Sequence, residues 1–312
     1  MANWLVTGGC GFIGSHLVEA LTARGDRVRV LDDLSTGKRE NLTASVDLAI
    51  GDVADAALVA RMASGVDGIF HLAAIASVQR SSEDWLGTHR TNLTGTIAVF
   101  EAARKTRAGQ PAPVVYASSA AVYGDNPAVP LREHATLQPL SAYGADKLGS
   151  ELHGRVAWAV HRVPNLGLRF FNVYGPRQDP SSPYSGVIAI FADRIVRDAV
   201  IEIFGDGQQS RDFIYVADVV AHLLAAMADL RADAQVLNVC TGRATTVLEL
   251  AAVIARIAGR PPRLKHGPAR IGDIRASIGN PAAAIERLGV HAKTMIADGL
   301  ERTLACLETS AG

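Results

Sequence analysis

Tyr143 and Lys147 are the two side chains whose types and spacing best suit chemistry in this sequence. Residues four positions apart on an α-helix share one face, so the Lys147 ammonium would lie beside the Tyr143 phenol. A neighbouring cation lowers the pKa of a phenol from its ordinary value of about 10 toward neutrality. The spacing therefore predicts a group that takes up and returns a proton. The alternative is a solvated helix face, where a tyrosine and a lysine are common at this spacing.

A glycine-rich turn near the N-terminus favours the chemical interpretation. Residues 4–7 predict a short buried strand and residues 15–21 an amphipathic helix, with Gly8, Gly11 and Gly14 between them. Such glycines permit a tight turn, let backbone N–H groups approach a pyrophosphate and allow the helix to pack closely on the strand. The anion then meets the positive end of the helix dipole. The turn predicts dinucleotide binding, with an ordinary glycine turn of an α/β protein as the alternative.

Carboxylates at the end of the next predicted strand indicate which dinucleotide binds. The strand at residues 27–31 ends at Asp32, eighteen positions beyond the last glycine of the turn, and Asp33 adds a second negative charge. A carboxylate there binds a ribose 2′-hydroxyl and repels a 2′-phosphate. The nearest cations, Lys38 and Arg39, follow only after a further turn. NAD is therefore favoured over NADP.

The composition excludes several classes of protein. The 312 residues carry 31 basic and 31 acidic side chains, so no global field recruits nucleic acid or an anionic membrane. Cys10, Cys240 and Cys306 have neither disulfide nor metal-ligand spacing, which predicts a reducing compartment and no metal site. The first strand begins near Met1, and no apolar run approaches the roughly 18 residues of a membrane span. We expect a soluble, cytoplasmic protein.

Strand and helix patterns alternate along the chain. This alternation predicts an α/β fold, a Rossmann-type doubly wound parallel sheet whose ligands lie at the carboxyl ends of the strands. After the glycine turn and the strand that ends at Asp32, the predicted strands are residues 48–50, 68–72, 114–118, 166–171 and 235–239.

A change of texture after Asn172 predicts a second, smaller α/β domain that binds substrate. The chain there becomes dense in proline, serine and glycine, which is typical of a loop. We expect residues 1–172 with about 208–239 to form the dinucleotide-binding domain. Residues from about 173–207, together with 240–312, would form the second domain.

Seven motifs carry a resemblance to a known family. They are residues 7–14, 51–53, 71–74, Asn92, 118–124, 169–175 and 211–216. With them, almost the whole chain resembles the extended short-chain dehydrogenase/reductase superfamily, specifically its nucleotide-sugar 4-epimerases. The resemblance implies NAD as cofactor, a UDP-sugar as substrate bound by the second domain, and a homodimer.

The resemblance also implies three groups of site residues. The catalytic residues would be Ser119, Tyr143 and Lys147. The cofactor would contact Gly8, Gly11, Phe12, Ile13, Gly14, Asp32, Asp33, Ser35, Thr36, Gly37, Asp52, Val53, Leu72, Ala73, Ala74, Asn92 and Ser118, besides Tyr143 and Lys147. The sugar nucleotide would contact Asn172, Val187, Ile188, Ile201, Ile203, Arg211, Arg270, Asp273 and Ser277, besides Ser119 and Tyr143.

Some of these roles have structural alternatives. Arg211 and Arg270 resemble diphosphate-binding arginines, but Asp212 or Asp273 is close enough in sequence to form a surface ion pair with them. Asn92 is expected to bridge backbone groups within the sheet rather than to take part in the chemistry.

The implied reaction uses the proton-transfer pair directly. Tyr143, as a phenolate stabilised by Lys147, removes the 4-hydroxyl proton while C4 of the sugar delivers hydride to NAD, and Ser119 bonds the same oxygen. Return of the hydride to the other face of the rotated 4-keto sugar inverts C4. A 4,6-dehydratase would place an Asp-Glu pair, and a decarboxylase a glutamate, where this chain has Ala120 and Ala121. A non-catalytic dinucleotide sensor would be expected to lose Tyr143 or Lys147.

Ser277 bears on the choice of sugar. In similar epimerases a tyrosine at this position excludes N-acetylated sugars and a small residue admits them. The resemblance therefore implies interconversion of UDP-GlcNAc and UDP-GalNAc, with UDP-Glc and UDP-Gal as weaker substrates. The alternative is a polar residue at a strand end. Residues 178–184 also resemble the corresponding loop of N-acetylhexosamine epimerases.

The implied dimer would form through a four-helix bundle. It would use the helix at about residues 92–107 and the helix that carries Tyr143. The apolar residues Ile97, Phe100, Leu148 and Leu152 would lie in this interface or, alternatively, in the core of one chain.

Overall fold

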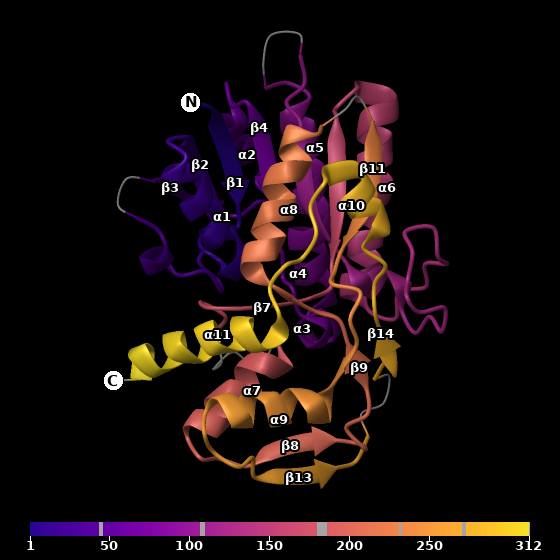
Figure 1. Cartoon of the computed structure of the whole chain (residues 1–312). Coiled ribbons are helices and arrows are strands. Elements are labelled where there is room, and N and C mark those ends of the chain that lie inside the picture. Colours follow the sequence, from indigo (N-terminus) through magenta and orange to yellow (C-terminus); the bar gives the residue numbers. More distant parts are fainter. Residues whose placement is uncertain (44–45, 107–109, 180–185, 231–232, 270–272, 312) are drawn as a thin grey trace.

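The computed structural model describes residues 1–43, 46–106, 110–179, 186–230, 233–269 and 273–311. A parallel sheet of seven strands fills the upper part of the molecule in Figure 1. Its spatial order is β3-β2-β1-β4-β5-β6-β11, so the strand order reverses between β1 and β4. This confirms the predicted Rossmann-type α/β fold. The strands are β1 Asn3–Thr7, β2 Arg27–Asp32, β3 Asp47–Ile50, β4 Gly68–His71, β5 Val114–Ser119, β6 Asn165–Phe170 and β11 Ala234–Val239.

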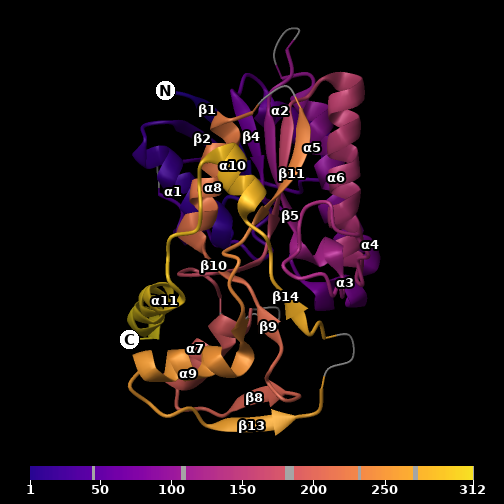
Figure 2. The same cartoon turned by 45° about the vertical axis from the view of Figure 1, so that its right-hand side comes forward.

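Helices cover both faces of this sheet (Figure 2). On one face, α1 (Phe12–Ala23), α8 (Val216–Ala228) and α10 (Ala282–Leu288) bury an aliphatic cluster that includes Leu17, Leu223 and Ala284. On the other face, α2 (Ala56–Ala63), α5 (Gly95–Ala103) and α6 (Ala142–His161) bury a second cluster that includes Val59 and Phe100. Burial on both faces explains why the strands are continuous apolar runs.

A smaller lobe lies below the carboxyl ends of the sheet in Figure 1. Its own core, which includes Phe191, Ile203 and Leu250, lies between helices and two parallel strands. The elements are α7 Val187–Val196, β8 Ile201–Phe204, α9 Val247–Ile257, β13 Leu264–Gly267 and α11 Ile296–Ala311, with the short strands β9 Ser210–Arg211, β12 Thr245–Thr246 and β14 Ala276–Ser277 beside them.

Two further segments bear on the boundary between the lobe and the sheet. Strand β7 (Asn172–Tyr174) pairs in parallel with β10 (Phe213–Tyr215) where the chain crosses between them. Helix α10, which the sequence places with the second domain, packs on β11 and α8 instead. The division into domains stays a prediction.

The helix expected at about residues 92–107 is built from three pieces. Helix α4 (Trp85–His89) continues through a π-helical turn at Arg90–Thr94 into α5, while α3 (Val78–Glu83) precedes it. Residues 107–109 lie outside the described part of the chain. π-turns are often found at functional sites.

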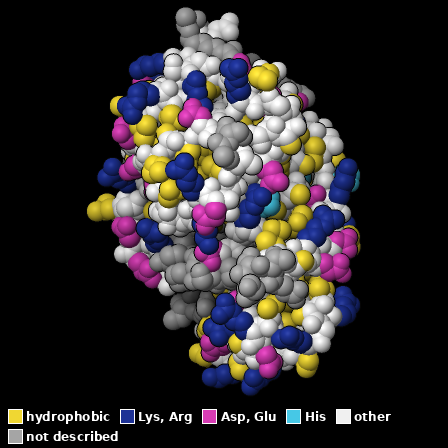
Figure 3. All heavy atoms as spheres, turned by 90° about the vertical axis from the view of Figure 1, so that its left-hand side faces the viewer, with side chains coloured by type: hydrophobic (Ala, Val, Ile, Leu, Met, Phe, Trp, Pro, Cys, Tyr) yellow, Lys and Arg dark blue, Asp and Glu magenta, His cyan; other side chains and the backbone are white. Residues whose placement is uncertain are grey.

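The surface carries both signs of charge. Figure 3 shows lysine and arginine interspersed with aspartate and glutamate on the face seen there, as the balanced composition predicts. Within the described ranges, no helix is both long and apolar enough to span a bilayer. The cytoplasmic location stays a prediction.

Candidate active site

A cavity of about 430 Å³ opens at the carboxyl ends of β1, β2, β4 and β5. The reversal of strand order between β1 and β4 creates this crevice, which is where open α/β sheets bind ligands. Seventeen of the residues expected to contact the cofactor line it. They are Gly8, Gly11, Phe12, Ile13, Gly14, Asp32, Asp33, Ser35, Thr36, Gly37, Val53, Leu72, Ala73, Ala74, Ser118 and the proton-transfer pair's Tyr143, and Lys147 lines it as well.

The glycine turn forms a cradle that a side chain would fill. Gly8 has φ +72°, and a Cβ there would come within 2.6 Å of the backbone nitrogen of Ala73. A Cβ on Gly14 would come within 2.0 Å of the Gly8 carbonyl oxygen. Helix α1 begins directly after Gly11, with no side-chain cap and no acidic residue in its first turn. Its free N–H groups therefore suit an anionic pyrophosphate.

Asp32 is fixed in the wall of the cavity. Its Oδ2 accepts from the Cys10 N–H at 2.9 Å, and its Oδ1 accepts from the Leu34 N–H at 2.9 Å. Burial raises the pKa of Asp32, the two amide hydrogen bonds lower it, and the charge of Asp33 raises it. Each carboxylate oxygen keeps a second lone pair for a hydroxyl donor. The arrangement suits a ribose hydroxyl, as the sequence predicts for NAD.

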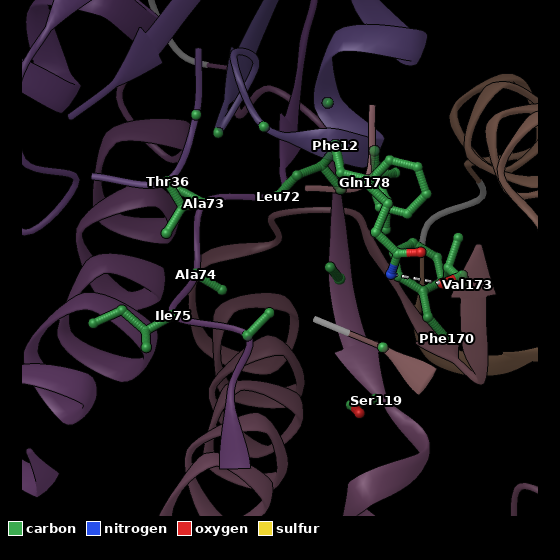
Figure 4. Close-up of a pocket in the computed structure, with 18 of the residues that line it drawn as sticks. Phe12, Thr36, Leu72, Ala73, Ala74, Ile75, Ser119, Phe170, Val173 and Gln178 are labelled. Carbon is green, nitrogen blue, oxygen red and sulfur yellow. Dashed lines mark hydrogen bonds between the residues drawn. The ribbon is translucent and has the colours of Figure 1, made fainter. Parts of the chain in front are cut away.

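The loop after β4 forms the next wall (Figure 4). Asn92, which is fully buried in the π-turn, braces this loop: its Oδ1 accepts from the Ile75 N–H at 2.8 Å and its Nδ2 donates to the Ile75 carbonyl at 3.2 Å. Asn92 does not line the cavity, whereas its neighbour Thr91 does. Asn92 therefore bridges backbone groups as expected, but in the loop after β4 rather than within the sheet. Its contact with the cofactor stays a prediction.

Asp52 also lies away from the cavity lining. One of its oxygens accepts from the Ala54 N–H at 2.8 Å, and the other pairs with Arg90 at 3.0 Å. Its neighbours Gly51 and Val53 line the cavity instead. A direct contact from the Asp52 side chain is thus not supported by this geometry.

The proton-transfer pair lies on α6 and faces the end of β5. The Lys147 Nζ is 5.8 Å from the centre of the Tyr143 ring and donates to the Ala117 carbonyl at 2.9 Å. Ser119, the last residue of β5, lines the same cavity, and its hydroxyl accepts from the Ala121 N–H at 3.1 Å. The structure therefore brings Ser119, Tyr143 and Lys147 together.

The electrostatics of the pair differ from the expectation. Burial raises the pKa of Tyr143, although a hydrogen bond with Ser119 lowers it. Burial lowers the pKa of Lys147 to about 8, while the charge of Asp146 raises it. In the chain alone the phenol pKa thus lies above its ordinary value, because loss of solvent outweighs the hydrogen bond with Ser119.

A buried ion pair behind the site went unnoticed in the sequence. Glu151 lies one helical turn beyond Lys147, and Arg169 lies on β6; both are 1% exposed. Arg169 donates to both carboxylate oxygens of Glu151, at 2.8 and 2.7 Å. The Ser118 hydroxyl donates to the same carboxylate at 2.5 Å. This ion pair fixes the end of β5 that carries Ser119. In the sequence, the four-residue spacing of Glu151 from Lys147 was the only sign of it.

A second cavity of about 740 Å³ lies in the smaller lobe. Asn172 and Val187 line both cavities, and Ile188 lines the first. Ile201 lines the second cavity, but Ile203 does not, because it points into the core of the lobe with no exposed surface. Ile201 and Ile203 share the core-facing side of β8, with Ile201 at its start also reaching the cavity, whereas Glu202 and Phe204 on the opposite side both line it.

Arg211 and Asp273 line this cavity and form an ion pair. The Arg211 Nη2 lies 2.6 Å from the Asp273 Oδ1, and its Nη1 donates to the Ile274 carbonyl at 2.7 Å. The pairing is the alternative anticipated for Arg211, and it leaves the guanidinium on the cavity wall. Arg194 and Lys265, which the sequence analysis missed, also line the cavity.

Two of the expected substrate residues are still to be placed. Ser277 lies on β14 opposite Arg211 of β9 and lines neither cavity. Arg270 lies outside the described residues, as does most of the 178–184 loop.

A segment that follows β7 contacts both α1 and the first cavity. His16 of α1 bonds the Pro176 carbonyl at 3.0 Å, and Arg177 pairs with Glu19 of the same helix at 2.6 Å. Gln178 lines the cavity and donates to the Val173 carbonyl at 3.5 Å, as Figure 4 shows. We call residues 176–179 the strap.

The fold and the site together define a dinucleotide-dependent enzyme of the Rossmann class. Comparison with known proteins specifies it further. Residues 4–240 match the NAD dependent epimerase/dehydratase family. The chain is 38% identical over 306 residues to a UDP-glucose 4-epimerase of Mycolicibacterium smegmatis, covering 96% of each.

Solved structures agree in the whole fold. A UDP-glucose 4-epimerase of Thermotoga maritima with UDP-glucose has a TM-score of 0.95 at 37% identity, covering 99% of this chain and 100% of that one. A UDP-N-acetylglucosamine 4-epimerase of Methanobrevibacter ruminantium, in complex with UDP-N-acetylmuramic acid, has a TM-score of 0.93 at 33% identity, covering 99% of each.

The chain therefore belongs to the NAD-dependent epimerase/dehydratase family, and its cofactor is NAD. The glycine cradle, the free end of α1 and the Asp32 carboxylate fit this cofactor.

Proposed function

We propose that the chain is a 4-epimerase that interconverts UDP-GlcNAc and UDP-GalNAc, with UDP-Glc and UDP-Gal as slower substrates. The observation that carries the proposal is the meeting of Ser119, Tyr143 and Lys147 in the first cavity, beside Asn172, which also lines the second. A sugar at the junction would have its nucleotide in the smaller lobe and its C4 beside the phenol.

Each of these side chains has a distinct role in the proposed reaction. Bound NAD supplies a reversible hydride acceptor. Tyr143 removes the proton of the 4-hydroxyl and later returns it, Lys147 stabilises the phenolate, and Ser119 donates to the same sugar oxygen. Hydride transfer needs close positioning of C4, which the rigid ends of β5 and α6 provide. Inversion requires the 4-keto sugar to turn over before the proton and hydride return.

The acidic residues at the first cavity argue against elimination. Among the described residues that line it, the carboxylates are Asp32 and Asp33, at the end of β2 rather than beside Ser119. Ala120 and Ala121 begin the 3₁₀ turn that follows β5, so methyl groups stand where a dehydratase would need an acid and a base. This favours epimerisation over the 4,6-dehydratase and decarboxylase alternatives.

The nucleotide end of the substrate would lie in the second cavity. Arg211 would bind the diphosphate, with Asp273 near the ribose and Val187, Ile188 and Ile201 around the base. Ile203 supports this wall from the core. The ion pair of Arg211 with Asp273 is compatible with diphosphate binding, because the diphosphate would replace one anionic partner of the guanidinium with another.

Ser277 supports the preference for acetylated sugars through its size and neighbours. The Asp212 N–H donates to the Ser277 carbonyl at 3.0 Å, and the Asp212 carbonyl accepts from the Asn172 N–H at 2.9 Å. Ser277 and Asn172 are therefore linked through one residue, so a larger side chain on β14 would crowd the sugar end. A neighbour named for UDP-N-acetylglucosamine favours the same preference.

The proposed homodimer would use an apolar stripe on α6. Leu152, Val156 and Val160 follow at intervals of four residues and are 52%, 50% and 66% exposed. Ile97 on α5 is 40% exposed, whereas Phe100 is buried in the core. The stripe suits a second copy of the chain. Sedimentation of Leu152→Glu should give monomers where the parent gives dimers; a monomeric parent would contradict the assembly.

A proton NMR time course tests the reaction. The purified protein is incubated with UDP-GlcNAc without added reductant, and the anomeric signals are followed. Growth of UDP-GalNAc to a plateau that is also reached from UDP-GalNAc supports the proposal. Conversion of UDP-Glc alone would refute the preference for acetylated sugars but would still support 4-epimerisation. A 4-keto-6-deoxy or decarboxylated product would refute epimerisation.

A further inference from the structure

A buried carboxylate with an unsatisfied oxygen lies next to Lys147. Asp146 is 4% exposed, and its Oδ1 accepts from the Nδ1 of His89 on α4 at 2.8 Å. Its Oδ2 has no hydrogen-bond partner among the described residues. Buried carboxylates are normally satisfied by several donors, because an unpaired charge is costly away from water. The position of Asp146 therefore needs an explanation other than stability.

The charged groups that face Lys147 can be compared one by one. On α6, Glu151 is neutralised by its two hydrogen bonds with Arg169 of β6. From β5, Lys147 meets the Ala117 carbonyl, and Ser118 and Ser119, which line the same cavity, carry no charge. The phenol on α6 is neutral until it gives up its proton.

The imidazole of His71 on β4 also faces Lys147, and its hydrogen bonds hold it neutral. The Thr96 hydroxyl donates to the Asn92 carbonyl at 2.6 Å, so the His71 Nε2, 2.9 Å from the same oxygen, must be the donor in that contact. Its Nδ1 then accepts from the Thr7 hydroxyl at 2.7 Å. Burial, together with the charge of Lys147, lowers the pKa of His71 to about 3.

Asp146 is thus the one anion beside Lys147, within the described part of the chain, that has no arginine or lysine partner. The exposed His89, 47% accessible, bonds it without removing it from the neighbourhood of the ammonium. The desolvation that lowers the pKa of Lys147 to about 8 is opposed by this carboxylate.

We propose that Asp146 is a positioning residue for the reaction, which keeps the buried Lys147 side chain protonated so that the ammonium can stabilise the Tyr143 phenolate. The inference rests on the proposed function for its catalytic meaning, but the charge relation itself concerns two residues of the free protein. Asp146 acts through Lys147 and touches no substrate.

A titration of the lysine side chains tests the charge relation without turnover. The chain has five lysines, so carbon-13 labelling of lysine gives few resonances, and loss of one in Lys147→Met assigns it. In Asp146→Asn the midpoint of Lys147 should fall by about one pH unit. Asp146→Ser removes the same charge with a smaller side chain and serves as the second variant.

Two matched controls separate charge from packing. Ser150→Ala alters an equally buried residue of α6 that bonds the Asp146 carbonyl at 2.9 Å, and changes no charge. His89→Gln removes the partner of Asp146 but keeps the carboxylate. Both should leave the Lys147 midpoint within about 0.3 pH unit of the parent. An unchanged midpoint in both Asp146 variants, or an equal shift in a control, would overturn the inference.

Kinetics then connect the titration to catalysis. Because the reaction needs charged Lys147, the alkaline limb of the kcat profile should move to lower pH by the same amount in Asp146→Asn, while NAD content and KM stay near those of the parent. An active parent with an unmoved limb refutes the catalytic part of the inference. An inactive parent that still shows the lysine shift refutes the proposed function and leaves the charge relation standing.

Discussion

The two cavities are built from different parts of the chain. The first is walled mainly by backbone at strand ends: the glycine turn, the loop after β4 and the end of β5. The second is walled by long side chains on α7, β8, β9 and β13, such as Arg194, Arg211 and Lys265. Backbone positions are dictated by the fold, whereas side chains are exchangeable one at a time. The first cavity is therefore expected to determine the chemistry and the second to determine the ligand.

Loss of the phenol gives the largest effect expected in the first cavity. Tyr143→Phe should lower kcat by roughly 10²- to 10⁴-fold, because it removes the group that moves the proton. NAD content should not change. Tyr116→Phe is the matched control, since it removes a fully buried phenol that lines neither cavity. Turnover in Tyr143→Phe close to that of the parent would contradict the division between chemistry and ligand.

A methyl group on the glycine cradle should act on NAD rather than on the sugar. Gly8→Ala places a Cβ 2.6 Å from the Ala73 nitrogen, so NAD affinity measured by calorimetry should fall on the order of 100-fold or more. Gly65→Ala is the control: Gly65 has the same φ of +72° but nothing within 4 Å. It should show only the stability cost of the left-handed backbone, about 1 kcal/mol. Equal NAD affinity in both variants would contradict the cradle.

The buried ammonium should cost stability in a defined pH range. The pKa of Lys147 is about 8 in the folded chain against 10.5 ordinarily, so the unfolded chain binds more protons between these values. The destabilisation of the folded chain by buried Lys147 is therefore at its full value below pH 8. It disappears as the pH rises from about 8 to 10.5, so the free energy of unfolding increases over this range. Lys147→Met should stabilise the cofactor-free protein by roughly 2 to 3 kcal/mol at pH 7.

Denaturant unfolding at pH 7 and at pH 10.5 checks that value. The advantage of Lys147→Met should shrink at the higher pH. Lys105→Met, on an exposed side chain, should show no such dependence. An advantage of Lys147→Met that is constant with pH would indicate packing rather than charge.

A change beside the second cavity should alter the choice of sugar and leave the chemistry intact. Ser277→Tyr should lower turnover of UDP-GlcNAc by about tenfold or more through crowding, while UDP-Glc turnover and NAD content stay near the parent. Ser277→Ala keeps the residue small and should behave as the parent does. If both sugars lose turnover equally, or neither does, the separation between the two cavities at this position is wrong.

Sequence patterns were sufficient for most of the first cavity because local rules determine it. Alternating apolar segments predicted all seven strands of the sheet, and the glycine spacing placed the turn at its carboxyl edge. The four-residue spacing put Tyr143 and Lys147 on one face of α6. Each of these inferences needs only neighbours along the chain.

Properties that depend on distant neighbours were not accessible in the same way. The ion pair of Glu151 with Arg169 joins α6 to β6, and the brace from Asn92 to Ile75 joins a π-turn to a loop. The direction of the Tyr143 pKa depends on burial, which spacing alone does not reveal. In the second lobe, Ile203 lines neither cavity because its side of β8 packs into the core of the lobe, and that packing depends on distant helices.

The strap has a consequence for time rather than for affinity. Pro176 and Arg177 tie it to α1 through His16 and Glu19, and Gln178 lines the first cavity, so we expect these contacts to slow the exit of a bound molecule. We expect a long residence time for the cofactor, set by local opening of the strap. The proposed epimerase would restore its own oxidant in every cycle, so slow exchange would not reduce its turnover, and it would work at low concentrations of free cofactor.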